Sequence, residues 1–174
     1  MSDFMHNVIS YKNFFPNIDS TVFVAPTAFV IGNVYISKDA SVWYNSVLRG
    51  DVGMISVGEG TNIQDNTVIH VDRNYGDTQI GKMVTVGHSC ILHACQIHDY
   101  AFVGMGSVVM DKVIMEENTM LASGSLVTKG KIIKSGELWA GRPAKFFRML
   151  SEEEINHIKE SASNYIQLSR DYLR

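Results

Sequence analysis

An apolar residue recurs at nearly every sixth position of this sequence, and this period restricts the fold more than any other feature. A helix presents one face about every 3.6 residues and a strand every two, so neither element explains a period of six. Such repeats are typical of solenoids, in which each short strand forms one side of a coil and directs one apolar residue inward. The sequence therefore predicts an all-β solenoid of triangular coils, with these inward positions: Val24, Val30, Ile36, Val42, Leu48, Val57, Ile63, Ile69, Ile80, Val86, Leu92, Ile97, Val103, Val109, Ile114, Met120 and Leu126.

Two stretches depart from this period, residues 49–56 and 71–79, and we expect both to leave the coils as loops. We find neither the alternating strands nor the hairpin signals that a sandwich or barrel would show. The glycine–proline segment 139–145 is expected to stop the coils. The repeat resembles that of the left-handed parallel β-helix of hexapeptide-repeat proteins, and the resemblance, not the period, implies the left hand.

A helix is predicted after the coils. Ser151 followed by Glu154 forms a capping-box pattern, in which each side chain bonds the other residue's backbone N–H. Apolar residues then recur at helical spacing, namely Ile155, Ile158, Ala162, Tyr165, Ile166, Leu168 and Leu173. We therefore expect a single domain over residues 1–174, with the β-helix over about 16–146 and the helix over about 151–173.

Composition and charge exclude several classes of function. The chain has 174 residues and a net charge of −3, which argues against nucleic-acid partners and anionic membrane surfaces. No run of 18 apolar residues could span a membrane. The first ten residues lack a basic segment followed by an apolar one, so a cytoplasmic protein is predicted. Cys90 and Cys95 match no disulfide or zinc-ribbon pattern, and we expect both to be buried.

Three of the six histidines are candidate metal ligands. His70 follows the inward Ile69 and His93 follows the inward Leu92, so both should occupy one column of adjacent coils. Stacked strands lie about 4.7–4.9 Å apart, close enough for two imidazoles to share one ion. Three neutral imidazoles suit zinc, iron or cobalt. The other histidines, His6, His98 and His157, are expected to be solvated.

His88 should lie on a different side of the coil from that column, because it follows the second-side residue Val86. From there it reaches the ion of a neighbouring subunit if prisms associate side by side. Three such interfaces close a homotrimer with one metal site at each interface. A fourth ligand position left to water would make the site catalytic in kind.

The sequence resembles the γ-class carbonic anhydrases of the short bacterial type. The matching segments are 47–51, 62–66 with His70, 87–88 with His93, and 140–145. The resemblance implies that His70, His88 and His93 bind the metal, two from one subunit and one from the next. It also implies a charged network across the trimer interface, formed by Arg49, Asp51 and Asp65. Asn62 and Gln64 would orient the metal-bound water and carbon dioxide. Tyr165 would be an aromatic residue that overhangs the pocket.

The implied reaction is the reversible hydration of carbon dioxide to bicarbonate by a metal-bound hydroxide at the trimer interfaces. The most active members of the family carry a glutamate after the aspartate that matches Asp51, where this chain has Val52. Only Asp72 and Asp77 are available in the polar loop. The resemblance therefore implies slow export of the proton and limited turnover.

Other interpretations remain open. Hexapeptide acyltransferases share the predicted prism, use one histidine as a general base and bind coenzyme A between prisms. A non-catalytic metal-containing scaffold or assembly subunit would also retain the three histidines. At the residue level, Arg49, Asp51 and Asp65 could form an ordinary surface salt-bridge cluster, and Gln64 could be a plain corner residue.

Overall fold

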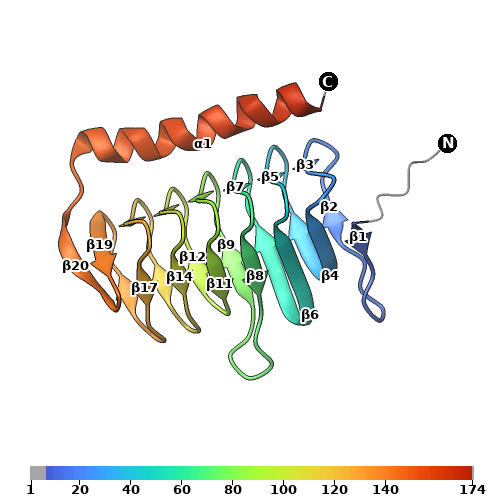
Figure 1. Cartoon of the computed structure of the whole chain (residues 1–174), viewed down its shortest axis with the longest axis horizontal. Helices are drawn as coiled ribbons and strands as arrows, with labels where there is room; N and C mark the ends of the chain where they lie inside the picture. Colours follow the sequence, from blue (N-terminus) through green and yellow to red (C-terminus); the bar gives the residue numbers. More distant parts are fainter. Residues whose placement is uncertain (1–6, 174) are drawn as a thin grey trace.

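The structure, a computed structural model, describes residues 7–173 and confirms the predicted solenoid with its C-terminal helix (Figure 1). It is a left-handed parallel β-helix of about seven turns. The elements are β1 (Val8–Ile9), β2 (Asn17–Ile18), β3 (Phe23–Val24), β4 (Phe29–Ile36), β5 (Ser41–Val42), β6 (Val47–Val57), β7 (Asn62–Ile63), β8 (Val68–His70), β9 (Thr78–Ile80), β10 (Thr85–Val86), β11 (Ile91–His93), β12 (Gln96–Ile97), β13 (Phe102–Val103), β14 (Val108–Val109), β15 (Ile114–Met115), β16 (Met120–Leu121), β17 (Leu126–Val127), β18 (Ile132–Ile133), β19 (Glu137–Gly141), β20 (Ala144–Met149) and α1 (Glu152–Tyr172).

Each coil contributes one strand to each of three faces. The first face contains β9, β12, β15 and β18, and the third contains β8, β11, β14 and β17. The second face is a separate sheet in the order β20-β19-β16-β13-β10-β7-β5-β3. The first and third faces join into one sheet because β4 and β6 each run continuously through the corner between them.

The core is a stack of inward residues, one from each side of each coil, and most of them are fully buried. The predicted positions are correct up to Val109 but wrong in the last triplet. Ile97 pairs with Met115, not with Ile114, and the same shift of one residue places Leu121 and Val127 inside. The 17-residue spacing from Ile80 to Ile97 does not recur, because the next coil has 18 residues.

Residues 49–56 form part of β6, so the prediction of a loop there is wrong. β6 pairs with β4 at residues 47–50 and 55–57, with a register shift between these two stretches, and it also pairs with β8 at residues 47–49 and with β9 at residues 55–57. The backbones come very close at this corner, since a Cβ added at Gly50 would lie 2.4 Å from the carbonyl oxygen of Asn33. The extra residues therefore form an irregular stretch within β6 at the corner, and the pairing with β4 resumes after them.

Residues 71–77 do leave the coil as a loop, as Figure 1 shows between β8 and β9, whereas Thr78 and Gln79 already belong to β9. Asp72 and Gly76 form an antiparallel bridge across the base of this loop. Thr78 Oγ1 donates a hydrogen bond to the carbonyl oxygen of His70, which closes the base on the other side. The loop is thus fixed at both ends where it joins the coil.

The coils end at the segment 139–145 as predicted, and they end in a hairpin whose turn is Arg142 and Pro143, which was not predicted. β19 and β20 pair antiparallel, with Trp139 opposite Phe146 and Gly141 opposite Ala144. The hairpin covers the last coil and reverses the chain, because a parallel strand at this position would need a further coil.

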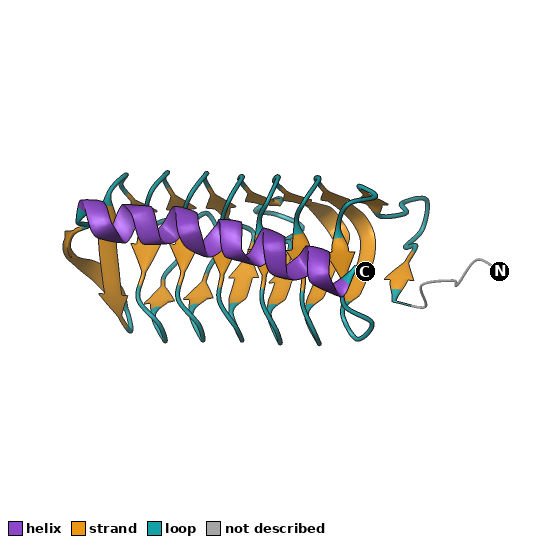
Figure 2. Cartoon of the chain, turned by 90° about the horizontal axis from the view of Figure 1, so that it is seen from above, coloured by secondary structure: helices purple, strands orange, loops and turns teal. Residues whose placement is uncertain are grey.

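α1 runs back along the second face from the hairpin to the first coils (Figures 1 and 2). The predicted capping box is present, with Ser151 accepting from the Glu154 N–H and Glu154 accepting from the Ser151 N–H. Ile158 and Ala162 are buried against the coils, whereas Leu168 and Leu173 are exposed, contrary to the predicted apolar face. Aromatic contacts compensate at the helix end, where Tyr172 lies 5.2 Å from Trp43 between ring centroids.

Candidate metal centre

The third face carries candidate site residues along both of its edges. The chain passes onto this face at Asp65 and His88, which we call the leading edge. It leaves the face at Arg49, His70 and His93, which we call the trailing edge. Register places Arg49, His70 and His93 in one column on adjacent strands.

At the trailing edge, the two histidines face each other as the repeat predicts. The Nδ1 atom of His70 lies 3.2 Å from the Nε2 atom of His93. Two nitrogens bound to a tetrahedral zinc at about 2.0–2.1 Å would lie about 3.3 Å apart. The spacing of the two imidazole nitrogens therefore fits a shared metal ion of this size.

The remaining nitrogen of each imidazole is hydrogen-bonded to a carboxylate. His70 Nε2 lies 2.9 Å from Asp51 Oδ1, and His93 Nδ1 lies 2.5 Å from Asp111 Oδ1. Such partners fix the tautomer and orientation of metal-binding histidines. Asp111 was not predicted, although it directly follows Met110, the next residue in the column of His70 and His93.

Arg49 forms an ion pair with Asp51 at the same edge. Burial raises the pKa of the Asp51 carboxyl, but hydrogen bonds from His70 and Arg49 outweigh this and hold the pKa below its ordinary value. Asp51 is therefore an ionised carboxylate that interacts with Arg49 and His70 at the same time. Within one chain, Asp65 lies at the leading edge, so the predicted trio of Arg49, Asp51 and Asp65 is not assembled.

At the leading edge, His88 has its own carboxylate. Its Nδ1 atom lies 2.7 Å from Asp65 Oδ2, and the His88 side chain is 43 % exposed. His88 and His93 belong to the same coil but lie at opposite edges of the third face. Over residues 7–173, no three His, Cys, Asp or Glu side chains converge on one point.

Asn62 and Gln64 lie beside the leading edge, on the second face beneath α1. Gln64 Nε2 donates to Asn62 Oδ1 over 3.1 Å, and both side chains are buried. Tyr165 of α1 packs edge-on against Trp43, with 5.4 Å between ring centroids. Burial, and secondarily the charge of Asp65, raise the pKa of the Tyr165 hydroxyl. Trp43, which the sequence reasoning missed, is the neighbour of Gln64 on the adjacent strand.

Between the two edges runs an apolar column on the outer surface of the third face. Register places one such residue on each of six adjacent strands. Three of them are 40–44 % exposed, and the other three are half-buried. We call this the apolar strip: Phe29, Val47, Val68, Ile91, Val108 and Leu126.

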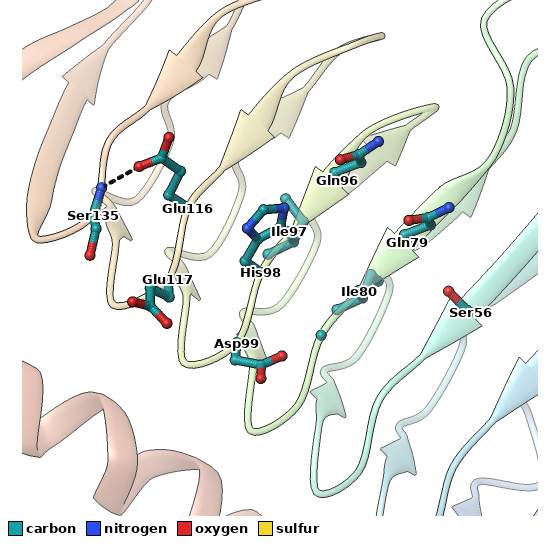
Figure 3. A pocket seen from close by; sticks show the side chains of 11 residues that line it. Ser56, Gln79, Ile80, Gln96, Ile97, His98, Asp99, Glu116, Glu117 and Ser135 are labelled. Atoms are coloured by element: carbon teal, nitrogen blue, oxygen red, sulfur yellow. Dashed lines mark hydrogen bonds between the residues drawn. The ribbon is translucent and has the colours of Figure 1, made fainter.

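An open groove of about 640 Å³ lies on the first face (Figure 3), and its lining includes none of His70, His88 and His93. His98 lines it together with Asp99, Glu116 and Glu117. His98 and His157 are exposed as predicted, while His6 lies outside the described residues. Cys90 and Cys95 are buried as predicted, and burial raises the pKa of Cys95 to about 12.

Comparison with solved structures places this architecture among the hexapeptide-repeat proteins. A hexapeptide transferase family protein from Anaplasma phagocytophilum is 64 % identical, with a TM-score of 0.91 over 94 % of this chain and 96 % of that one. A hexapeptide-repeat acetyltransferase of Vibrio cholerae is 22 % identical, with a TM-score of 0.51 over 56 % of this chain and 61 % of that one, and it shares the fold alone. No protein-family model matches the chain.

Named relatives then specify the family. The chain is 36 % identical to a carbonic anhydrase of Geobacillus kaustophilus, over 95 % of this chain and 90 % of that protein. It is 38 % identical to protein YrdA of Escherichia coli, over 94 % and 92 %. It is 54 % identical to the mitochondrial γ carbonic anhydrase 2 of Arabidopsis thaliana over 89 % of this chain, but it spans only 58 % of that relative's length. The chain belongs to the γ-class carbonic anhydrase family.

The predicted location in the cell stays a prediction. Among the described residues, no helix combines the length and the apolar composition that crossing a membrane requires. The Escherichia coli relative is bacterial, whereas the Arabidopsis relative is mitochondrial by name.

Proposed function

We propose that this protein catalyses the reversible hydration of carbon dioxide to bicarbonate, at metal sites formed between the subunits of a homotrimer. One observation carries the proposal: His70 and His93 present two nitrogens 3.2 Å apart, and each ring is held from behind by a carboxylate. The names of the relatives support the same reaction. The metal is proposed as zinc, with iron or cobalt as alternatives.

The third ligand is proposed to be His88 of a neighbouring subunit. If prisms pack side by side in parallel, His88 and His93 lie at the same height, because they belong to the same coil. The leading edge of one chain then faces the trailing edge of the next. This arrangement also brings Asp65 towards Arg49 and Asp51, so the interface network implied by the resemblance would form across the contact.

The apolar strip supports a second copy of this chain as the occupant of the third face. It lies between the two edges, so any contact that joins leading to trailing edge also covers it. Contiguous exposed apolar surface of this kind marks interaction sites. Because the two edges differ, the contact between subunits is heterologous, and a closed assembly of such contacts is a ring. Three triangular prisms make the smallest ring of this kind.

Within the site, the residues of the chain have separate tasks. A bound metal supplies a water of lowered pKa, and hence a nucleophile near neutral pH. His70, His88 and His93 would hold the metal, while Asp51, Asp65 and Asp111 fix the imidazole tautomers. Gln64 would accept a hydrogen bond from the reacting water through Oε1, and Tyr165 with Trp43 would bound the pocket on its helix side.

The structure offers no free carboxylate near the site in the loop 71–77 to carry the proton away. Asp77 accepts from the Met54 N–H over 2.7 Å. Asp72 accepts from the Asn74 and Tyr75 N–H groups, and these bonds lower its pKa. Val52 is half-buried in β6 and cannot titrate. Proton export is therefore proposed to depend on dissolved buffer.

The test is stopped-flow hydration of carbon dioxide by protein prepared without a histidine tag and analysed for metal content. We expect activity that follows metal content, and its loss together with bound metal in His93→Ala. His98→Ala is the matched control, since His98 is exposed on the first face, and it should retain both. Metal-loaded protein with a hydration rate equal to background would contradict the proposed function and favour a non-catalytic scaffold.

Coenzyme A-dependent acyl transfer is a second candidate, because the 64 % identical structure carries a transferase name. A transferase needs one histidine as base, which leaves three carboxylate-paired histidines without an explanation. Calorimetric titration with coenzyme A and acetyl-coenzyme A separates the two functions. We expect no binding, and saturable binding at micromolar concentration would favour the transferase.

A further inference from the structure

A series of side-chain hydrogen bonds, buried except for the one that reaches the helix, links α1 to Gln64. Gln64 Nε2 donates to Asn62 Oδ1 over 3.1 Å, and Asn62 Nδ2 donates to Thr85 Oγ1 over 3.0 Å. Thr85 Oγ1 in turn lies 3.2 Å from Ser161 Oγ on α1, which is 76 positions away in sequence. Asn62 and Thr85 are fully buried.

The backbone sets which atom donates and which accepts in this series of hydrogen bonds. Asn62 Nδ2 also donates to the carbonyl oxygen of Val84 over 3.4 Å, so a reversed amide would place two acceptors against each other. Asn62 Oδ1 must therefore face Gln64. Since Thr85 accepts from Asn62 and is buried, its hydroxyl hydrogen has Ser161 Oγ as its acceptor among the described residues.

This direction decides which end of Gln64 is available. With Nε2 engaged by Asn62, the Oε1 atom of Gln64 accepts no hydrogen bond from any described residue. A carbonyl-type oxygen is the end that can accept from a water and orient its lone pairs. An amide free to rotate would present its N–H₂ group for part of the time and lose this function.

We propose that Thr85 and Ser161 are positioning residues, which fix the amide of Gln64 so that Oε1 faces the reacting water. The inference rests on the proposed hydration function and extends it to residues that do not touch the substrate. It also gives α1 a part in the site beyond covering the second face, since Ser161 holds one end of the chain of hydrogen bonds.

Four variants test the proposal, each measured for metal content and for hydration kinetics. Thr85→Val keeps the branched shape and removes the hydroxyl, and we expect kcat/KM to fall about threefold to tenfold, the effect of one neutral hydrogen bond. Thr85→Ser should restore the wild-type rate. Ser161→Ala should lower the rate in the same direction. Ser163→Ala, an exposed serine on the same helix that bonds only within the helix, should not.

A double-mutant cycle separates positioning from general damage. In a Gln64→Ala background, Thr85→Val should lower the rate no further, because its effect acts through Gln64. Equal losses in both backgrounds, or wild-type rates in Thr85→Val and Ser161→Ala, would overturn the inference while wild-type activity stands. A wild-type protein that fails to hydrate carbon dioxide would instead overturn the proposed function. Metal content should be unchanged in all these variants.

Discussion

At the scale of single residues, Asp111 is the side chain whose role follows most directly from geometry. It holds His93 Nδ1 and so leaves His93 Nε2 directed at His70. Carboxylate partners of this kind contribute about 10–100-fold to metal affinity. We therefore expect Asp111→Asn to weaken metal binding by about that factor, measured by competition with a chromophoric chelator.

Asp99→Asn is the control for Asp111→Asn, because Asp99 is also a corner aspartate but bonds only the Lys82 N–H. It should retain full affinity for the metal. Equal affinities of Asp111→Asn and the wild-type protein would show that His93 keeps its orientation without the carboxylate.

Sequence reasoning located His70 and His93 but not Asp111, and the reason is physical. The period fixes which residues share a column, so an imidazole following each inward residue is predictable. The carboxylate that reaches such an imidazole, however, depends on side-chain rotamers and on the backbone conformation of the corner. Neither of these follows from the period. The position of Asp111 after Met110 was a usable signal, since the predicted register holds up to Val109, but it does not show which way the Asp111 side chain turns.

Val52 offers a second prediction at this scale. If dissolved buffer carries the proton, hydration should rise with imidazole concentration and then saturate. Val52→Glu places a carboxyl beside Asp51 in β6, so we expect a higher rate at low buffer and a flatter dependence. Val52→Gln has the same shape without the titratable group and should behave as the wild-type protein. A hydration rate that changes neither with buffer concentration nor in Val52→Glu would contradict the proposed export of the proton by dissolved buffer.

At the scale of elements, the start of α1 depends on Glu154. Hydrogen bonds from Arg148 and the Ser151 N–H lower the pKa of Glu154 to about 2. Because the pKa is depressed on folding, its stabilising effect is present above about pH 4.5 and is lost as the pH falls towards about 2. We expect Glu154→Gln to cost about 0.5–1 kcal/mol at pH 7, discounted for the exposure of the pair.

Thermal unfolding followed by far-ultraviolet circular dichroism checks this at several pH values. The difference between Glu154→Gln and the wild-type protein should shrink steadily below pH 4.5. Glu153→Gln, an exposed neighbour in the same turn, is the control variant and should leave thermal stability at pH 7 unchanged. A difference that stays constant down to pH 2 would place the effect of Glu154 in packing and not in charge.

The elements also show where periodicity stops being informative. Past Val109 each strand has two adjacent apolar residues, as in Ile114–Met115 and Leu126–Val127. Hydrophobicity alone cannot tell the inward from the outward member, so one irregular coil shifts the whole assignment. Likewise, the additional residues in 49–56 could leave the coil or extend a strand, and only the pairing of β6 with β4 decides between these.

At the scale of the whole molecule, the proposed sites each draw on two chains. A mixture of His88→Ala and His93→Ala subunits, refolded together, should therefore regain part of the metal binding that either variant lacks alone. In a mixed trimer, some interfaces combine the intact leading edge of a His93→Ala subunit with the intact trailing edge of a His88→Ala subunit. The measurement is bound metal per trimer, alongside the oligomeric state by light scattering. No recovery in mixed trimers, or a monomer at micromolar concentration, would contradict the shared site.

The loop 71–77 can vary in length and sequence without changing the coils that position His70. Its two ends are pinned by Asp72–Gly76 and by Thr78 to His70, while its tip makes no strand pairs with the coils. Doubling the length of such a loop costs only about 0.6 kcal/mol in closure entropy. Insertions in this loop can therefore bring new side chains next to the trailing edge while the position of His70 stays the same.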